Sequence, residues 1–267
     1  MKFSNSKIRS LLTTSVLAFS VTSVWSTNAL AANAPAPTLA PAPAPTFVNL
    51  QILMEGAAQN VSGMMSTSLW DKGLIVPGQN LQSPCRDNSM HQITVTNPIP
   101  QTTPVDLVCV EIREQSFPMT VHTSFVGIVQ ANGMINFTDG SIPIIQLDHS
   151  DDYYVVVLHK SHLPIASELK SINNSMLYVN FRSEPTGSFG GVHQTNVGGG
   201  WAMFAGNTDQ NGNQVRDING GDSAYWSQIY PLSNTYSPAD VNLDGDVDMT
   251  DKALITLNNG LFSNIPF

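Results

Sequence analysis

The chain has 267 residues, a mass of 28.8 kDa and a formal net charge of −9, with 11 Lys and Arg against 20 Asp and Glu. Phosphate groups are bound by cationic side chains, so this acidic balance argues against a nucleic-acid partner. The length beyond residue 46 is enough for one sizeable domain and a small one.

The first 31 residues have the three parts of a secretory signal peptide. Lys2, Lys7 and Arg9 make a basic start, residues 11–24 form an apolar run, and residues 29–31 read as a small-residue cleavage site. The apolar run is shorter than the ~20 residues that a spanning helix needs. We therefore expect a secreted protein, extracellular or at the cell surface, with no membrane span in the mature chain.

Residues 32–46 alternate Ala and Pro without charge. Such a segment cannot bury a core and is expected to form an extended, polyproline-like spacer. It would either hold the folded part away from a surface or act as an arm that docks on a neighbouring subunit.

Residues 47–185 are mostly strand-like. The segments 47–56 and 91–97 alternate apolar and polar residues, whereas 105–114 is apolar on both faces, as in the middle of a sheet. Asn132-Gly133 is a strong signal for a hairpin turn. The segment 62–77 is the least strand-like and is predicted to be a loop.

Short strands separated by turn residues, without a long amphipathic helix between them, predict a mainly β domain with an antiparallel β-sandwich fold. Its two cysteines, Cys85 and Cys109, favour a disulfide in an exported protein. Two separate buried thiols are the alternative. After the sandwich, the glycine-rich segment 186–200 reads as a connection to a small α-helical calcium-loop subdomain at 201–267.

The subdomain carries its clearest motif at residues 240–251, DVNLDGDVDMTD. Oxygen-bearing side chains occupy alternate positions of a twelve-residue loop with glycine at the sixth position, which is the spacing that Ca²⁺ ligation needs. The candidate ligands are Asp240, Asn242, Asp244, Asp246, Asp248 and Asp251.

An imperfect copy of this loop begins at Asn207. Its twelfth position falls on Ile218, which cannot bind calcium, so a four-residue insertion is expected to give the closing role to Asp222. Short helices are predicted after both closing aspartates, at 222–230 and 251–259. The candidate ligands of this weaker loop are Asn207, Asp209, Asn211, Asn213 and Asp222.

These repeats resemble type I dockerin modules, whose loops read D-x-N-x-D-G-x-x-x-x-x-D before a helix. Positions ten and eleven, here Met249 and Thr250, help dockerins to recognise a cohesin partner. The strings at 63–77, 105–114, 132–140, 153–167 and 198–212 are similar, in the same order, to a module of large secreted bacterial surface proteins. This resemblance covers about residues 47–267 and implies an exported, surface-associated, non-catalytic protein.

Other groups of residues are weaker indications of a metal, ligand-binding or catalytic site. His159 and His162 could share a zinc ion with His149 or Asp148, or could simply hydrogen-bond within a turn. Sugar stacking and core packing are alternative roles for four aromatic residues, Trp70, Trp201, Trp226 and Tyr153. The chain has five glutamates, Glu55, Glu111, Glu114, Glu168 and Glu184, and none lies in a recognisable catalytic string.

The sequence thus predicts a non-enzymatic, calcium-binding structural or adhesive protein. Self-association, including assembly into fibres, is compatible with this prediction. The alternatives are a dockerin-like module that binds a cohesin-type receptor and a carbohydrate-binding protein.

Overall fold

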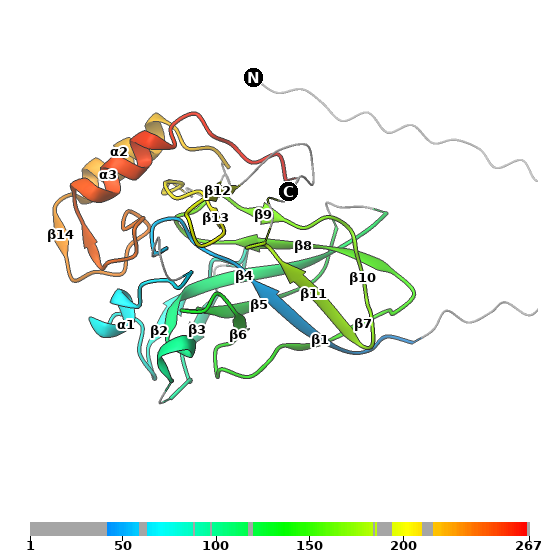
Figure 1. Cartoon of the computed structure of the whole chain (residues 1–267). Helices are drawn as coiled ribbons and strands as arrows, with labels where there is room; N and C mark the ends of the chain where they lie inside the picture. Colours follow the sequence, from blue (N-terminus) through cyan, green and yellow to red (C-terminus); the bar gives the residue numbers. More distant parts are fainter. Residues whose placement is uncertain are drawn as a thin grey trace, which may run out of the picture. The chain divides into compact units, whose positions relative to one another are not determined.

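The structure is a computed structural model that describes residues 42–58, 63–87, 89–96, 98–116, 120–183, 185, 194–209 and 216–265. The expected signal peptide and most of the expected spacer lie outside these residues. All described residues belong to one compact unit (Figure 1). Within them, no helix has the length and apolar character that crossing a bilayer requires.

The larger sheet is built around β4 (Pro104–Glu114) and has the strand order β10–β8–β4–β5–β6, with β9 paired to β8. All of these pairs are antiparallel. Every residue of β4 from Pro104 to Arg113 is buried, which confirms the central strand predicted from its two apolar faces. The other bounds are β5 Val121–Gln130, β6 Ile135–Phe137, β8 Asp152–Leu158, β9 Ile165–Ala166 and β10 Lys170–Ser171.

The second sheet has the order β11–β1–β7, with β1 at Ala44–Gln51, β7 at Ile144–Leu147 and β11 at Met176–Asn180. β1 is antiparallel to β7 but parallel to β11, so the prediction of a purely antiparallel sandwich is wrong here. The reason is topological. β1 and β11 are separated by most of the domain rather than by a tight turn, and a long connection permits parallel pairing.

β1 also corrects the end of the spacer. The strand begins at Ala44, so residues 44–46 belong to the sheet and not to the Ala/Pro segment. Pro45 is tolerated because it lies next to the first residue of the strand, where a missing N–H group costs least.

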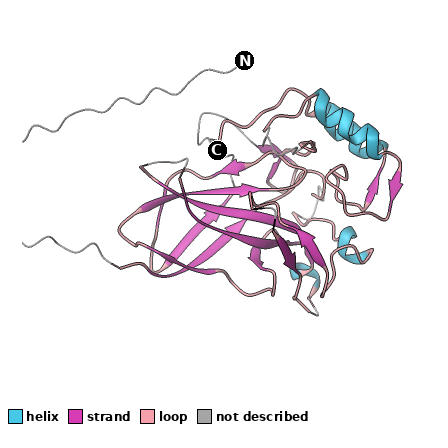
Figure 2. Ribbon diagram, turned by 180° about the vertical axis from the view of Figure 1, so that it is seen from behind, coloured by secondary structure: helices cyan, strands magenta, loops and turns pink. Residues whose placement is uncertain are grey.

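The two sheets face each other across one hydrophobic cluster (Figure 2). β1 contributes Val48 and Leu50, and β4 contributes Val108 and Val110, all fully buried. Leu69 of α1 (Ser68–Asp71) belongs to the same cluster, so the segment 62–77 is not the simple loop predicted. The domain is therefore mainly β, with two layers. Its remaining short elements are β2 Asn80–Gln82, β3 Met90–Gln92 and the 3₁₀ turn η1 Pro100–Thr102.

The hairpin predicted at Asn132-Gly133 is confirmed: β5 and β6 pair across this turn, and Gly133 has a φ of 86°. A side chain is strained at such an angle, which glycine adopts freely. Within the glycine-rich segment 186–200, residues Gln194–Asn196 form β12 and pair with β13 (Trp201–Met203). Residues 186–193 lie outside the described part of the chain.

The C-terminal part contains α2 (Gly220–Ile229) and α3 (Met249–Leu257), which lie side by side at one end of the sheets (Figure 1). Each helix begins two residues earlier than predicted, because Asn219 and Asp248 act as N-caps and accept N–H bonds from the first turn. A short ladder of β14 (Leu232–Ser233) and β15 (Asp246–Val247) lies between them in sequence. The helices bury a second hydrophobic cluster, centred on Ile218, Trp226 and Ile255.

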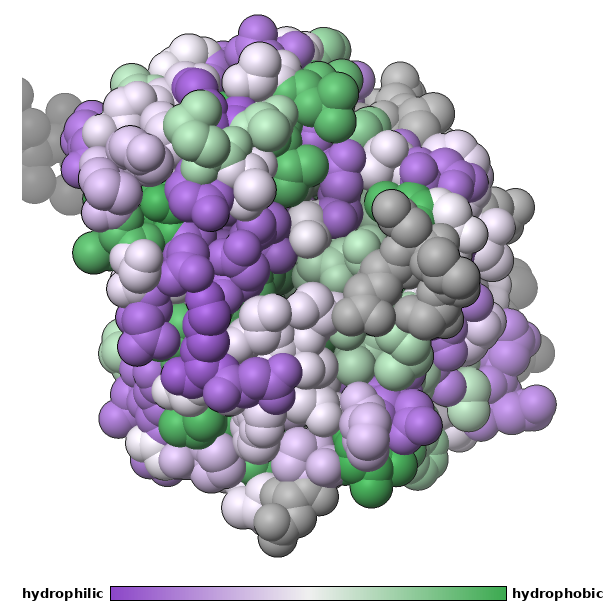
Figure 3. All heavy atoms as spheres, turned by 60° about the vertical axis from the view of Figure 1, so that its left-hand side comes forward, coloured by the Kyte–Doolittle hydropathy of each residue, from purple (hydrophilic) through white to green (hydrophobic). Residues whose placement is uncertain are grey.

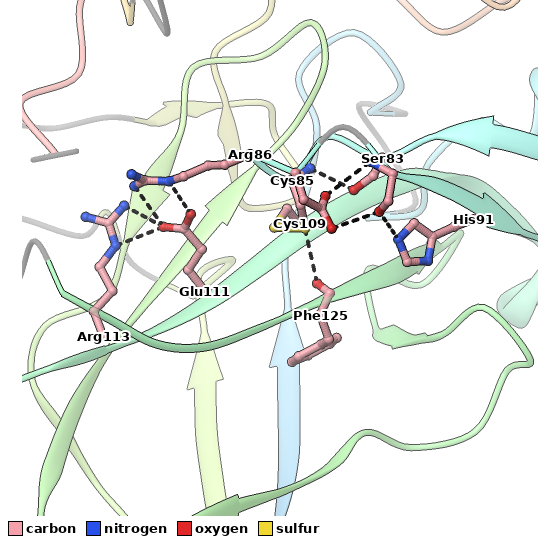
Figure 4. Close-up of a disulfide and its surroundings, with 10 residues drawn as sticks. Ser83, Cys85, Arg86, His91, Cys109, Glu111, Arg113 and Phe125 are labelled. Atoms are coloured by element: carbon pink, nitrogen blue, oxygen red, sulfur yellow. Dashed lines mark hydrogen bonds and ion pairs between the residues drawn. A yellow bond between two sulfur atoms is a disulfide. The ribbon is translucent and has the colours of Figure 1, made fainter.

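A disulfide joins Cys109 in the middle of β4 to Cys85 after β2, with an S–S distance of 2.04 Å (Figure 4). It closes a loop of 24 residues in sequence separation. The bridge ties the segment that contains β2 to the most buried strand of the domain.

Gly56 marks a close approach between the sandwich and the C-terminal part. A Cβ atom at this position would lie 2.1 Å from Val241 O and 2.5 Å from Asn242 Cα. Because both are main-chain atoms, Gly56→Ala should force the 240–251 loop away and lower the stability by about 1–3 kcal/mol. Thermal unfolding measures this. Gly220→Ala is the control, because nothing lies within 4 Å of its Cβ, and it should be neutral or slightly stabilising.

Candidate functional site

The loop at 240–251 is held closed by its first and last aspartates. Asp240 accepts the N–H groups of Asp244 (3.1 Å) and Gly245 (2.9 Å). Asp251 accepts those of Val241 (2.8 Å) and Asn242 (3.1 Å) through one oxygen and that of Asp248 (2.8 Å) through the other. The closing aspartate therefore fixes the start of the loop to the start of α3.

Both aspartates are fully buried, and burial disfavours the charged carboxylate. Burial raises the pKa of Asp240 to about 7, against the opposing charge of Lys160 and with a further increase from Asp251. Burial also raises the pKa of Asp251 to about 6, although its three main-chain hydrogen bonds act in the other direction. The loop thus carries two buried acidic groups, and a nearby positive charge would stabilise their ionised forms.

The middle of the loop holds three further predicted ligands. Asn242 donates to Asp244 Oδ2 (2.9 Å) and to Thr250 Oγ1 (2.7 Å). Asp248 caps α3 by accepting Thr250 N–H (2.7 Å). The sharp turn between them is made by two residues with positive φ, Leu243 at 58° and Gly245 at 87°.

Asp246, another predicted ligand, contacts residues outside the loop in this structure. Its carboxylate pairs with Lys72 at 2.7 Å and accepts the N–H of Asn234 at 2.9 Å. Both interactions draw the side chain toward the surface between α1 and β14. The seventh position of such a loop normally supplies a main-chain carbonyl rather than a side chain, which explains the difference.

The first loop repeats the same closing pattern through Asp222. This buried aspartate accepts the N–H groups of Thr208 (2.5 Å) and Asp209 (3.1 Å) through Oδ1 and that of Asn219 (2.7 Å) through Oδ2. With the four-residue insertion left out of the count, these donors occupy the second, third and ninth positions of the loop, as Val241, Asn242 and Asp248 do in the other. Asp222 thus stands where the insertion hypothesis places the closing residue. Asn207 is buried at the start of this loop, and Asn211 and Asn213 lie outside the described residues.

Two acidic groups of the first loop lie near Asp222. Asp209 Oδ1 is buried with no hydrogen-bond partner in the described part of the chain. Burial, Asp222 and Asp217 together raise the pKa of the Asp209 carboxyl. Sequence reasoning missed Asp217, which accepts an amide hydrogen bond from Asn219 at 2.9 Å. Asp217 stands two residues before Asn219, as Asp246 stands two residues before Asp248, so alignment of the two loops with the four-residue insertion left out would have identified it.

Among the described residues, no three His, Cys, Asp or Glu side chains already stand together as metal ligands. The carboxylates of Asp240, Asp251 and Asp222 accept main-chain N–H groups. The available donors in both loops are nonetheless all oxygen atoms, which suits a hard cation such as Ca²⁺ rather than zinc. The orphaned Asp209 oxygen and the buried acids of the second loop fit such a cation.

The two histidines, His159 and His162, belong to a buried polar network. His149 contacts Thr46 at 2.9 Å, and Asp148 accepts the N–H of Ser150 at 2.9 Å. His159 and His162 contact each other through their Nδ1 atoms at 2.9 Å. The missing acidic member is Asp106 on β4, which His159 Nε2 approaches at 3.1 Å. Asp106 lies far from the two histidines in sequence, so no local motif links it to them.

Lys160 and Tyr236 complete this network. The Lys160 ammonium contacts Asp106 Oδ2 and lies 4.2 Å from the centroid of the Tyr236 ring. Tyr236 donates its hydroxyl to Asp106 Oδ1 at 2.7 Å. Burial opposes ionisation of Asp106, but Lys160 and His159 outweigh it and hold the pKa of Asp106 below its usual value. Tyr236 lies only four residues before Asp240, so the network joins the sandwich to the calcium-loop segment.

The aromatic residues offer little support for sugar stacking. Tyr153 and Trp226 are buried, and Trp226 donates its Nε1–H to Asp248 O at 3.1 Å. Trp70 and Trp201 are half-buried. The space-filling view of the side that carries the helices shows extensive hydrophilic surface, with hydrophobic residues in scattered groups (Figure 3).

Three of the five glutamates contact other polar side chains. Glu111 forms ion pairs with Arg86 and Arg113, Glu55 accepts from Asn258 at 2.6 Å, and Glu114 is 3.7 Å from His122. Glu168 is exposed, and Glu184 lies outside the described residues.

No protein-family model matches the chain, and no curated protein matches it. Two solved structures are similar at a distance. Both are interface mutants of a type II cohesin–X–dockerin complex from Acetivibrio cellulolyticus. The C-terminal interface mutant has 14 % identity and a TM-score of 0.43 over 82 % of this chain and 97 % of that chain. The N-terminal interface mutant has 14 % identity and a TM-score of 0.40 over 82 % and 96 %. A likeness this distant does not define the partner of the present chain.

Proposed function

We propose that this protein is an exported, calcium-stabilised structural or adhesive component of the cell surface or extracellular matrix. In this proposal, Ca²⁺ binds the loops at 240–251 and 207–222 and fixes α2 and α3 to the end of the sandwich. The observation that carries it is the burial of Asp240 and Asp251 at the two ends of the loop, where burial raises their pKa values to about 7 and about 6.

The contacts between the loops and the sandwich support a clamp rather than a sensor. Lys72 pairs with Asp246, Tyr236 bonds to Asp106, and Asn258 donates to both Glu55 and Ala205 O. Metal binding that orders the loops would therefore also order this junction, so binding free energy becomes folding free energy. A disulfide between Cys85 and Cys109 is in keeping with an oxidising, extracellular location.

Calcium titration with thermal unfolding tests the proposal. Ca²⁺ at 100 times its Kd should raise the stability by about 2.7 kcal/mol per occupied site, and excess chelator should reverse the rise. Mg²⁺ is the control ion, because it demands a smaller octahedral cage and should give a smaller shift. An unfolding curve that is the same in Ca²⁺ and in chelator would rule the clamp out.

Docking on a cohesin-type receptor is the second candidate function. Met249, at the tenth position of the loop, is 60 % exposed on α3, which favours a contact there. Recovery of one specific partner by the immobilised full-length mature chain would favour docking, whereas homotypic assembly would favour the structural role.

A further inference from the structure

Lys160 and Asp106 are in direct contact at a site with little exposure to solvent. β4 and β8 are antiparallel neighbours whose register ends at Cys109 and Leu158. The chain beyond these residues brings the Lys160 ammonium onto Asp106 Oδ2. Asp106 is fully buried, and only 12 % of the Lys160 side chain is exposed. An amine and a carboxyl group are therefore held together with little water around them.

We propose that Lys160 and Asp106 condense into an intramolecular isopeptide bond, which makes Lys160–Asp106 a self-modification site of the folded protein. A bond forms between Lys160 Nζ and Asp106 Cγ, the bond from Cγ to Oδ2 breaks, and one water molecule leaves. No oxidant, reductant or further reactant is required. Fixing both groups in contact removes the entropic cost that makes the same condensation slow between free molecules.

The carboxyl group is polarised on the side that would become negative. Asp106 Oδ1 accepts two hydrogen bonds, one from the N–H of Leu107 at 2.7 Å and one from the Tyr236 hydroxyl at 2.7 Å. Two fixed donors on one carbonyl oxygen form an oxyanion hole, which stabilises the tetrahedral adduct produced by attack of the amine. Tyr236 and the Leu107 main chain are thus placed as catalytic groups.

The other oxygen is placed to leave as water. His159 Nε2 lies 3.1 Å from Asp106 Oδ2, so in its donor tautomer His159 can protonate the departing hydroxyl. In that tautomer His159 Nδ1 is an acceptor. The hydrogen of the 2.9 Å bond between the two rings is then on His162 Nδ1. Burial lowers the pKa of both histidines, which favours neutral rings that can pass a proton on. His162 is a positioning residue here.

The amine must lose a proton before it attacks. The resting state is an ion pair, and transfer of one proton from Lys160 Nζ to Asp106 Oδ2 converts it into a neutral amine and a neutral acid. Because the two groups are already in contact, this transfer needs no movement of either side chain. The second amine proton leaves through His159 as the adduct collapses. A cleft of about 390 Å³ is lined by Lys160 and Tyr236 and gives the released water a way out.

Peptide mapping of the reduced, purified wild-type protein tests the proposal. The expected result is one branched peptide that joins the segments around residues 106 and 160 and is lighter than their sum by one water molecule. Lys160→Arg should abolish the branched peptide, whereas the control Lys170→Arg should retain it. Asp106→Asn should form the same link with loss of ammonia instead of water, because an amide then supplies the leaving group.

Two linear peptides with no branched product in the wild-type protein would overturn the proposal. This decision does not depend on whether the variants fold. Tyr236→Phe and His159→Gln, followed during refolding by mass, should slow bond formation at least ten-fold if these groups act on the reacting atoms. Unchanged rates in both would contradict their assigned roles. The readout does not involve calcium, so it is independent of the proposed clamp.

Discussion

In calcium-free buffer, the Asp240→Asn variant should gain stability relative to the wild-type protein as the pH rises from about 4 to about 7. Burial raises the pKa of Asp240 to about 7, so the folded wild-type protein keeps a proton that the unfolded chain releases above its ordinary pKa of 3.8. That contribution to stability is complete below pH 3.8 and is lost as the pH rises through 7. At about 1.4 kcal/mol per pKa unit, the change approaches roughly 4 kcal/mol.

Denaturant unfolding of both proteins across this pH range, with chelator, measures the change as a difference. Contributions from other groups, such as the buried His159 and His162, occur in both proteins and cancel. Saturating Ca²⁺ should invert the result at pH 7, because the metal binds the deprotonated carboxylate and only the wild-type protein gains from it.

Asp246→Asn is the matched control for Asp240→Asn. It makes the same chemical change within the same loop, but its carboxylate is one-third exposed and paired with Lys72. Solvent screens an exposed pair of this kind, so the calcium response should be retained. Equal pH profiles for the wild-type protein and Asp240→Asn would show that Asp240 is not the buried titrating group.

Local patterns in the sequence predicted the parts of the fold that depend on neighbouring residues. The run 105–114, apolar on both faces, identified β4 as a central strand, and Asn132-Gly133 located the turn between β5 and β6. The spacing of the 240–251 loop identified Asp240 and Asp251, and both are buried at the start and end of the loop. These features are set by side-chain periodicity and turn geometry, which a single sequence carries.

Long-range partners could not be predicted in the same way. The parallel pairing of β1 with β11 depends on how the whole domain closes, and nothing in either strand encodes it. Asp106 and Tyr236 lie 130 residues apart and have no shared motif, yet they meet at one hydrogen bond. Asp246 fits the ligand pattern, yet its carboxylate pairs with Lys72 at the C-terminal end of α1. Tertiary contacts decided each of these outcomes.

Glu111→Gln should be among the most destabilising single substitutions in the sandwich. Glu111 receives Arg113 at 2.6 Å and Arg86 at 2.7 Å, and both guanidinium groups are directed at its carboxylate (Figure 4). The side chains of Glu111 and Arg113 are 2 % and 0 % exposed. Loss of one partner from a buried ion pair typically costs 3–5 kcal/mol, about 10 °C in Tm for a domain of this size.

The surrounding charges make this site unusually sensitive to the loss of Glu111. Burial, and then the neighbouring Arg113 and Arg86, lower the pKa of Arg216 to about 9, while Glu111 acts in the opposite direction. Burial likewise lowers the pKa of Arg113, and Glu111 is the group that offsets it. A neutral amide at position 111 would leave three arginines in one region without this opposing charge.

Glu114→Gln is the matched control, because it makes the same change three residues further along β4. Glu114 is 39 % exposed, lies 3.7 Å from His122 and should alter the stability by less than about 0.5 kcal/mol. Arg86→Ala should fall between the two, since the Arg86 side chain is one-third exposed and Glu111 would keep its bond to Arg113. Unfolding of Glu111→Gln within 1 kcal/mol of the wild-type protein would contradict this prediction, because it would show that the buried Glu111–Arg113 ion pair near the end of β4 contributes little to stability.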